Sequence, residues 1–578
     1  MKIISAGLLL MNVAFGQPQL RSLRAVPVPE PSGLSEYVRD KAALIRLGKV
    51  FFWDMQAGSD GVTACATCHF HAGADHRPQN SLVDPNSPFR VNVDLSTVLF
   101  PLYLLSDPRN RNSAVVRDSG VRVGSAGTFR RIFECIVPGQ AAELGRDALD
   151  KPEFMRGDLQ VRRVTPRNAP SVFNTVYYVR NFWDGRAGRT FDGFTVTGAN
   201  EAEAPGVLVA RNGGLERQRV RIDKASLAAQ AMGPVLDHLE MSYAGRTWPM
   251  LGKKLLSLPP LARQIVAIDD SVLGPLARKE ARGLEEQHTY FAMIQSAFEP
   301  KFWESAERLN AAGELDPMGE FTQVEHNFSL FWGLALQAYQ STLNSDASPF
   351  DRFMEGDNQT LTPQEQEGMR LFQNAAGCTR CHNGAEFSAA AVNENGSTRA
   401  DSFERTGVRP VGDDIGSGNG AFKSIGLRNV EFTGPYFHNG GQSTLEQVVD
   451  FYRRGGDFAP INGDLRAFAA TPGQTAAIVA FLKALSDDRV RYERAPFDHP
   501  ELCVPVGHEE DESGGLKPGD VATSAAERWR GLAAVGAGGN AAPLQTFDEM
   551  LRKFGENGER AHAMNEACSA PLAAAVTR

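Results

Sequence analysis

The sequence predicts a mainly α-helical protein that is organised around two units of the same kind. The motif C-x-x-C-H occurs twice, as CATCH at residues 65–69 and as CTRCH at residues 378–382. Hydrophobic residues recur with helical spacing over residues 34–54, directly before the first copy. Residue patterns typical of helix starts flank the second copy. The sequence contains no other internal repeat.

The C-x-x-C-H motif is the attachment signature of a c-type haem. Its two thiols can each form a thioether to a vinyl group of one porphyrin, and the histidine is then placed under the iron as a ligand. One copy alone also fits a redox dithiol, half of a zinc site or chance. Two copies in a chain of 7 cysteines favour two covalently bound haem c groups. The predicted haem-binding residues are Cys65, Cys68, His69, Cys378, Cys381 and His382, of which His69 and His382 are iron ligands.

The composition sets broad limits on function. A length of 578 residues suits about three domains, and a hydrophobic share of 42% is ordinary for a globular protein. The formal net charge of −9 argues against nucleic acid as a partner. It weakly favours a basic or neutral partner, although ordinary solubility is the explanation that we prefer.

Residues 1–16 have the pattern of a short signal peptide. Lys2 supplies the positive charge, residues 3–13 the apolar run and residues 14–16 a small-x-small cleavage site. The run is too short to span a bilayer, and a buried first strand or helix is the alternative. Covalent attachment of haem c happens outside the cytoplasm, so we expect a periplasmic or secreted protein that does not span the membrane.

The rest of the chain divides into an N-terminal haem domain, a C-terminal haem domain and an extension. These are residues 17–344, 345–495 and 496–578, with a polar, proline-containing boundary at residues 345–357. The N-terminal domain contains irregular or β-rich insertions at about residues 86–160 and 190–225. The second insertion includes a probable hairpin around Asn212 and Gly213. The extension is polar, with one possible helix near residues 547–554.

Local signals predict several helices and one disulfide. Thr362 and Ser443 each open a predicted helix with a capping box, and Thr471 opens a third, apolar helix. Residues 287–342 have a helical, aromatic-rich pattern. An oxidising compartment permits a disulfide, for which we favour Cys503–Cys568 because both residues lie in the extension. Cys135 is then a free thiol.

Several motifs stand in the order found in the bacterial di-haem cytochrome c peroxidase and MauG superfamily, which this chain resembles. They are LGKVFFWD before CATCH, RNAPSVFN, FWDGRA, QAMGPVLDHLEM, SPFDRFMEGD, LRNVEFTGPYFHNGG and LEQVVDFY. The resemblance covers about residues 34–76, 167–187, 228–242 and 326–486. It implies two cytochrome c-like haem domains packed together, a peroxidatic first haem and an electron-transferring second haem.

The resemblance also implies roles for three residues around the haems. Trp183 in FWDGRA matches a tryptophan between the haems and is the expected electron relay, with an ordinary core tryptophan as the alternative. Glu240 matches a distal glutamate that would move a proton between the two oxygens of bound peroxide. Gln230 matches a glutamine that hydrogen-bonds the peroxide. Outside such a motif, Gln and Glu are usually solvated surface residues.

A structural calcium ion between the domains is a further implication of the resemblance. Asn168, Thr433 and Pro435 fall on the matching positions. One side-chain oxygen and two backbone carbonyls, completed by water, suit a hard cation.

The ligand of the second iron departs from the peroxidases of the superfamily, which use Met. No Met occurs between His382 and Met550, and the matching position is Tyr452, the ligand type of the MauG subgroup. Tyr452 shares a helix face with Leu445, Val448 and Val449. A phenolate is a hard donor that favours Fe(III) and Fe(IV), which predicts a low-potential second haem. His438 is the rival ligand.

The distal side of the first haem also departs from the peroxidase pattern. A removable distal histidine is expected well downstream of the first motif, yet only His71 and His76 precede His238. His71 is too near the proximal ligand, and His76 is the alternative to an open, five-coordinate iron, which we favour.

These features predict an enzyme that uses hydrogen peroxide to form high-valent haem iron and oxidises a protein or organic substrate, as MauG-like proteins do. The first alternative is a cytochrome c peroxidase that detoxifies peroxide with electrons from a small carrier protein. The second alternative is a non-enzymatic electron-transfer cytochrome.

Overall fold

The computed structural model describes residues 20–82, 94–198, 205–393, 402–463, 465–521, 523–556 and 568. The α-helices are α1 (Lys41–Trp53), α2 (Ala66–His69), α3 (Ser226–Gln230), α4 (Trp248–Leu256), α5 (Tyr290–Ala297), α6 (Gln323–His326), α7 (Phe328–Gln340), α8 (Pro349–Met354), α9 (Pro363–Gln373), α10 (Leu445–Arg453), α11 (Pro472–Lys483), α12 (Asp488–Arg491) and α13 (Phe547–Glu556). The predicted signal peptide lies outside the described residues. No helix in the described part of the chain is both long and apolar enough to cross a membrane.

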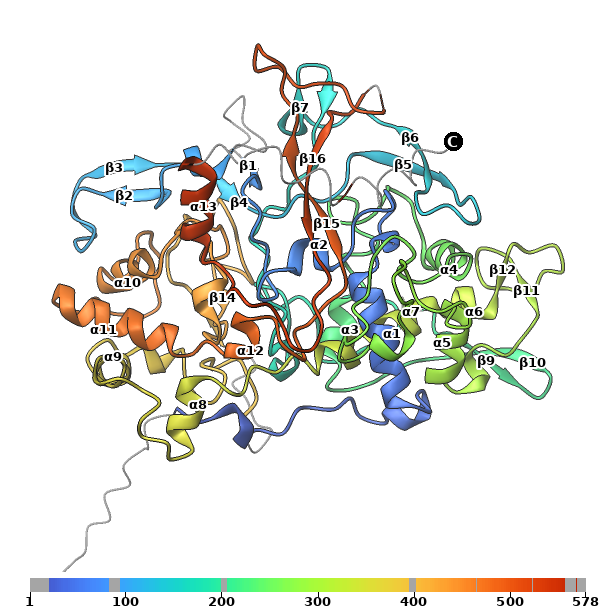
Figure 1. Cartoon of the computed structure of the whole chain (residues 1–578), viewed down its shortest axis with the longest axis horizontal. Coiled ribbons are helices and arrows are strands. Elements are labelled where there is room, and N and C mark those ends of the chain that lie inside the picture. Colours follow the sequence, from blue (N-terminus) through green and yellow to red (C-terminus); the bar gives the residue numbers. More distant parts are fainter. Residues whose placement is uncertain are drawn as a thin grey trace, which may run out of the picture.

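Every strand in the described residues belongs to a two-stranded antiparallel sheet. The pairs are β1 (Ser81–Leu82) with β4 (Arg122–Val123), β2 (Tyr103–Leu105) with β3 (Val115–Asp118), β5 (Arg131–Cys135) with β6 (Leu144–Asp147), β7 (Met155–Arg156) with β8 (Leu159–Gln160), β9 (Val207–Arg211) with β10 (Gly214–Gln218), β11 (Arg308–Leu309) with β12 (Phe321–Thr322), β13 (Phe403–Glu404) with β14 (Phe422–Lys423), and β15 (Leu502–His508) with β16 (Glu527–Leu532). Figure 1 shows two groups of helices side by side, α1 and α3–α7 in one and α8–α11 in the other. The strands lie around these groups and between them.

The two helical cores use the same device for close packing. In the first core, a Cβ at Gly48 of α1 would lie 1.9 Å from the carbonyl oxygen of Ala335 on α7. In the second, a Cβ at Gly368 of α9 would lie 1.9 Å from the carbonyl oxygen of Ala477 on α11. Because glycine has no Cβ, each helix pair can cross at a distance that any other residue would prevent.

The first core differs from the predicted helices at its edges. The helix predicted over 34–54 begins only at Lys41, where the Asp40 carboxylate accepts two backbone hydrogen bonds, from Ala42 and Ala43. The helical pattern predicted over 287–342 is interrupted by the strands β11 and β12 between α5 and α6. Helix α7 is buried along its whole length because its sequence is apolar on nearly every side.

The second core confirms one of the two predicted capping boxes, at Thr362, and the predicted helix start at Thr471. Thr362 pairs with Glu365 at the start of α9, and Thr471 pairs with Gln474 at the start of α11. The prediction at Ser443 is wrong by one residue, because Thr444 is the residue that caps α10. The stretch predicted as a linker contains α8, whose Asp351 forms a buried ion pair with Arg428.

The insertions contain the expected short strands, including the predicted hairpin. β9 and β10 are joined by Asn212 and Gly213, both with positive φ of 51° and 80°. These values suit a two-residue type I′ turn, for which Asn-Gly is the preferred sequence.

The C-terminal extension is more structured than its composition suggests. All residues of β15 are buried, and Leu502, Val504 and Val506 belong to the first core. The predicted helix near 547–554 is confirmed as α13. Figure 1 shows the β15–β16 hairpin running between the two groups of helices. The polar average composition of the extension therefore conceals one apolar strand.

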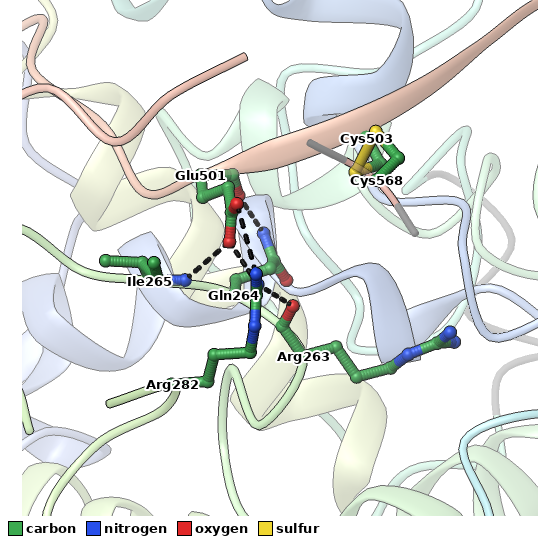
Figure 2. Close-up of a disulfide and its surroundings, with 7 residues drawn as sticks. All are labelled: Arg263, Gln264, Ile265, Arg282, Glu501, Cys503 and Cys568. Carbon is green, nitrogen blue, oxygen red and sulfur yellow. Dashed lines mark hydrogen bonds and ion pairs between the residues drawn. A yellow bond between two sulfur atoms is a disulfide. The ribbon is translucent and has the colours of Figure 1, made fainter. Parts of the chain in front are cut away.

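A disulfide joins Cys503 to Cys568, as predicted, and Cys135 is free and exposed. Figure 2 shows Glu501, near this disulfide, held by the loop at residues 263–265. Its carboxylate accepts a hydrogen bond from the Ile265 N–H at 3.0 Å and pairs with Arg282. The start of β15 is thus fastened to the first group of helices.

The first described residues pack on the second unit, although the sequence-based boundary assigns them to the first. Leu20 lies in the second core beside Phe350. The Leu23 N–H donates to the Asp351 carboxylate at 2.9 Å. A segment early in the chain therefore reaches across to the helices that follow residue 345.

Candidate haem sites

The first C-x-x-C-H motif forms the short helix α2 and its flanks. Cys65 and Cys68 are unpaired thiols, and burial raises the pKa of each to about 12. His69 Nδ1 lies 2.8 Å from the Gly73 carbonyl oxygen, which leaves Nε2 available as an iron ligand. Two thiols outside any disulfide and a correctly oriented imidazole therefore fit the covalent attachment of one haem.

A cavity of about 670 Å³ lies beside this motif. Cys68 and His69 line it together with Gln230, Glu240 and Trp183. A smaller cavity that shares His69, Gln230 and Glu240 also reaches Cys65. The structure thus brings the predicted distal residues to the cavity of the first motif.

Glu240 is held at the end of a turn after α3. Its N–H donates to the Asp237 carbonyl oxygen at 3.2 Å. Burial raises the pKa of the Glu240 carboxyl to about 7, and the negative charge of Asp237 adds to the rise. A carboxyl group with this pKa can both accept and return a proton near neutral pH.

His71 and His76 lie elsewhere. Their rings stack on each other at 3.7 Å between centroids, and the His76 ring lies 5.6 Å from that of Phe547 in the extension. His71 Nε2 bonds the Gln545 carbonyl oxygen at 2.8 Å. Neither residue lines the cavity that contains Glu240.

The second motif is arranged like the first. Neither Cys378 nor Cys381 is in a disulfide, and His382 Nδ1 lies 3.0 Å from the Phe387 carbonyl oxygen, so Nε2 is again available for iron. Its cavity, of about 170 Å³, is lined by one face of α10. That face consists of Leu445, Val448, Val449 and Tyr452, as the helical spacing predicts.

Tyr452 faces His382 across the second cavity. The ring centroids are 6.5 Å apart and the ring planes are nearly perpendicular, at 88°. Burial raises the pKa of the Tyr452 hydroxyl above its ordinary value, so the phenol stays protonated until a cation binds it. The donor set of imidazole and phenol fits a haem iron between them.

The alternative iron ligand, His438, contacts other residues. Its ring stacks on Phe422 at 3.6 Å, and its Nε2 points toward Asp414, 4.0 Å away. It lines the second cavity at an edge next to Trp183, with ring centroids 6.2 Å apart. Tyr452 is thus the residue whose ring stands opposite His382.

Trp183 lines both cavities. Its side chain is 8% exposed, and its Nε1–H donates to the Asn168 carbonyl oxygen at 2.7 Å. A buried, anchored indole between two cavities matches the position that the sequence motif predicts for a relay.

The residues expected to bind calcium lie partly together. The Asn168 side-chain amide contacts the Pro435 carbonyl and lies 3.5 Å from that of Phe437. Thr433 follows a 3-10 turn just before Pro435. In the described part of the chain, no group of three or more His, Cys, Asp or Glu side chains forms a metal cluster.

Part of the chain is similar to known proteins. Residues 143–359 match the family model for di-haem cytochrome c peroxidase. MauG of Methylorubrum extorquens is 33% identical over 187 residues, which cover 30% of this chain and 47% of that protein. The chain is similar to members of the di-haem cytochrome c peroxidase and MauG superfamily. Within it, cytochrome c551 peroxidase of Pseudomonas aeruginosa is 27% identical over 335 residues, 57% of this chain and 67% of that protein.

The superfamily match is partial in length. IdrP1, a cytochrome-c peroxidase of Denitromonas iodatirespirans, is 34% identical over 26% of this chain and 48% of its own length. The chain thus spans about half the length of several curated relatives. Among solved structures, a MauG-like protein associated with microbial copper homeostasis matches 85% of this chain and 98% of its own, with 17% identity and a TM-score of 0.40.

Some residues at the sites carry no superfamily motif and were missed. The guanidinium of Arg77 donates to Cys68 Sγ at 3.4 Å and to the Pro505 carbonyl of β15 at 3.3 Å. Lys423 lines the second cavity as a buried cation. Spacing gave no signal for either residue, since both are placed by tertiary contacts.

Proposed function

We propose that this chain is a di-haem oxidoreductase that uses hydrogen peroxide to oxidise a protein or organic substrate. The observation that supports it most strongly is the cavity shared by His69, Glu240 and Gln230, with Trp183 on its wall. A haem attached at Cys65 and Cys68 would supply an iron that binds peroxide and accepts its two oxidising equivalents.

The side chains of the first cavity perform the proton chemistry. The Glu240 carboxylate takes the proton from the peroxide oxygen that is bound, and returns it to the oxygen that leaves as water. The Gln230 amide donates a hydrogen bond that orients the peroxide. With a pKa of about 7, the Glu240 carboxyl is suited to both proton transfers at neutral pH.

Trp183 then connects this cavity to the second one. Its indole, fixed by the hydrogen bond to Asn168, provides a route for electrons between the two sites. Asn168, Thr433 and Pro435 would bind a calcium ion near this point, which would hold the two units in place.

Tyr452 supports the MauG-like reading over a cytochrome c peroxidase. A hard phenolate ligand disfavours Fe(II), so reduction of the second haem by a carrier protein would be difficult. Oxidising equivalents would instead be shared by both haems and withdrawn by a substrate. The alternatives are peroxide detoxification with a small electron carrier and electron transfer without turnover. We propose a periplasmic or secreted location, since haem c attachment occurs there.

Absorption spectra before and after one equivalent of hydrogen peroxide test the proposal. The ferric protein should contain one high-spin haem and one haem with histidine and tyrosine ligands, and peroxide should change both. Two low-spin haems that do not respond to peroxide would exclude an enzyme of this kind. Rapid turnover with reduced cytochrome c would favour the carrier-fed peroxidase.

A further inference from the structure

Lys423 is a buried cation at the second cavity that the proposed function leaves without a role. Its side chain lines the cavity, and the residue is 7% exposed. Strand β14 fixes its position through pairing with β13. The backbone N–H of Lys423 donates to the Trp183 carbonyl oxygen at 2.7 Å. The amine is therefore held at the edge of the cavity that is next to Trp183.

The hydrogen bonds of this amine are incomplete. Nζ donates to the Arg180 carbonyl oxygen at 3.2 Å and lies 4.0 Å from the centre of the Tyr178 ring. An ammonium group has three N–H donors, so these contacts satisfy only part of its hydrogen-bonding capacity. A buried cation with unfilled donors is costly unless an anion completes the site.

No carboxylate from the described residues lies within 4.0 Å of the amine. The two acids that act on it from a distance already have partners. Asp184 pairs with Arg167 at 2.7 Å, and Glu386 lies 3.5 Å from Arg428. Burial lowers the pKa of the Lys423 amine to about 7, as expected for a cation without a close counter-charge.

We infer that the Lys423 Nζ binds a carboxylate of the group that fills the second cavity, namely a propionate of the haem attached at Cys378 and Cys381. Haem carries two propionates, and one of them would meet the amine in a charge-assisted hydrogen bond. The pairing would hold one haem edge against Trp183. The inference rests on the proposed haem content but not on peroxide chemistry.

Arg405 is the matched control within the same cavity. It also lines the cavity as a cation, but its Nε donates to the Asn462 side chain at 3.2 Å. Lys423→Met and Arg405→Met therefore each remove one positive charge from one cavity. Lys423→Arg keeps the charge and restores hydrogen-bond donors.

The test is a spectroelectrochemical titration of the second haem, with redox-difference infrared spectra of the carboxylate stretch. In the full-length di-haem protein, Lys423→Met should lower the midpoint potential, because a lost cation stabilises Fe(III), and should shift a propionate band. Lys423→Arg should remain close to wild type. Arg405→Met should shift the potential less and leave that band unchanged.

Several outcomes decide the inference. A wild-type potential and carboxylate band in Lys423→Met would overturn it, as would a larger band shift in Arg405→Met. If Lys423→Met does not accumulate, Lys423→Gln is measured by the same two readouts. The protein could be inert to peroxide while its Lys423 variants still show the shifts in midpoint potential and carboxylate band. That result would refute the proposed function and retain the propionate contact.

Discussion

The two cavities hold the same attachment motif in unlike surroundings. The first, of about 670 Å³, has Glu240 and Gln230 on its wall, and no described histidine of the loop after α2 enters it. The second, of about 170 Å³, is lined by the apolar face of α10, and the Tyr452 ring stands 6.5 Å from that of His382. One cavity presents a carboxyl group that could exchange protons, and the other presents a side chain that could bind iron.

This difference teaches that the attachment motif does not set the chemistry of a haem. Both proximal histidines donate through Nδ1 to a backbone carbonyl, Gly73 in one case and Phe387 in the other. The opposite wall of each cavity carries the distinction, and each of those walls comes from a segment remote in sequence. Changes to those walls should therefore separate the behaviour of the two haems.

The largest expected effect comes from Glu240→Gln. Removal of the acid–base group should slow the reaction with peroxide about 10²–10⁴-fold, the usual contribution of general acid–base catalysis. Stopped-flow absorption measures this rate, and the spectrum of the second haem should not change. An unaltered rate would remove Glu240 from the mechanism and with it the contrast between the cavities.

The next largest effect is expected from loss of the disulfide in the C-terminal extension. Cys568→Ser breaks the link to Cys503 in the first core and should lower the free energy of unfolding by about 2–4 kcal/mol. Thermal and denaturant unfolding under non-reducing conditions measure the loss. Cys135→Ser is the control, because that thiol is free and exposed, and it should behave as wild type.

The pH dependence of the peroxide reaction gives a smaller effect. The Glu240 carboxyl must be ionised to accept the first proton, and its pKa is raised to about 7. The rate should therefore rise about tenfold between pH 6 and pH 8. Asp237→Asn removes a negative charge that raises this pKa, so the midpoint should move to lower pH. A midpoint that stays in place would assign the titration to another group.

The smallest effect on the peroxide rate is expected from Tyr452→Phe. The spectrum of the second haem should change, while the rate at the first haem should alter by less than about tenfold, or 1.4 kcal/mol. Tyr436→Phe is the matched control, since Tyr436 lines the same cavity on another segment. If the Tyr452 variant keeps the wild-type spectrum, or if His438→Ala changes it instead, the ligand assignment is wrong.

The sequence predicts local features of this molecule well. The capping box at Thr362, the helix start at Thr471, the Asn-Gly hairpin and the face of α10 follow from short-range rules, and all are present. The positions of Glu240 and Trp183 came from motif resemblance, because no spacing rule links residues so distant from residue 69.

Tertiary contacts explain what the sequence did not reveal. Strand β15 is buried, although the C-terminal extension as a whole is polar. Only a few residues of the extension face the first core, so they hardly change its average composition. Lys423 is a buried amine because strand pairing places it there, and a lone lysine in a sequence usually indicates solvent exposure. The shift of the α10 cap from Ser443 to Thr444 shows that two adjacent hydroxyl residues compete for one role.

The position of β15 has a consequence for the order of assembly. The first attachment motif ends at residue 69, whereas the strand that packs beside it begins at Leu502, and Arg77 joins the two by contacting both Cys68 and Pro505. During synthesis, the first pair of thiols emerges hundreds of residues before the strand that packs beside it exists. Under the proposed function, haem attachment at this motif could therefore precede closure of the hairpin, which the disulfide between Cys503 and Cys568 then fastens.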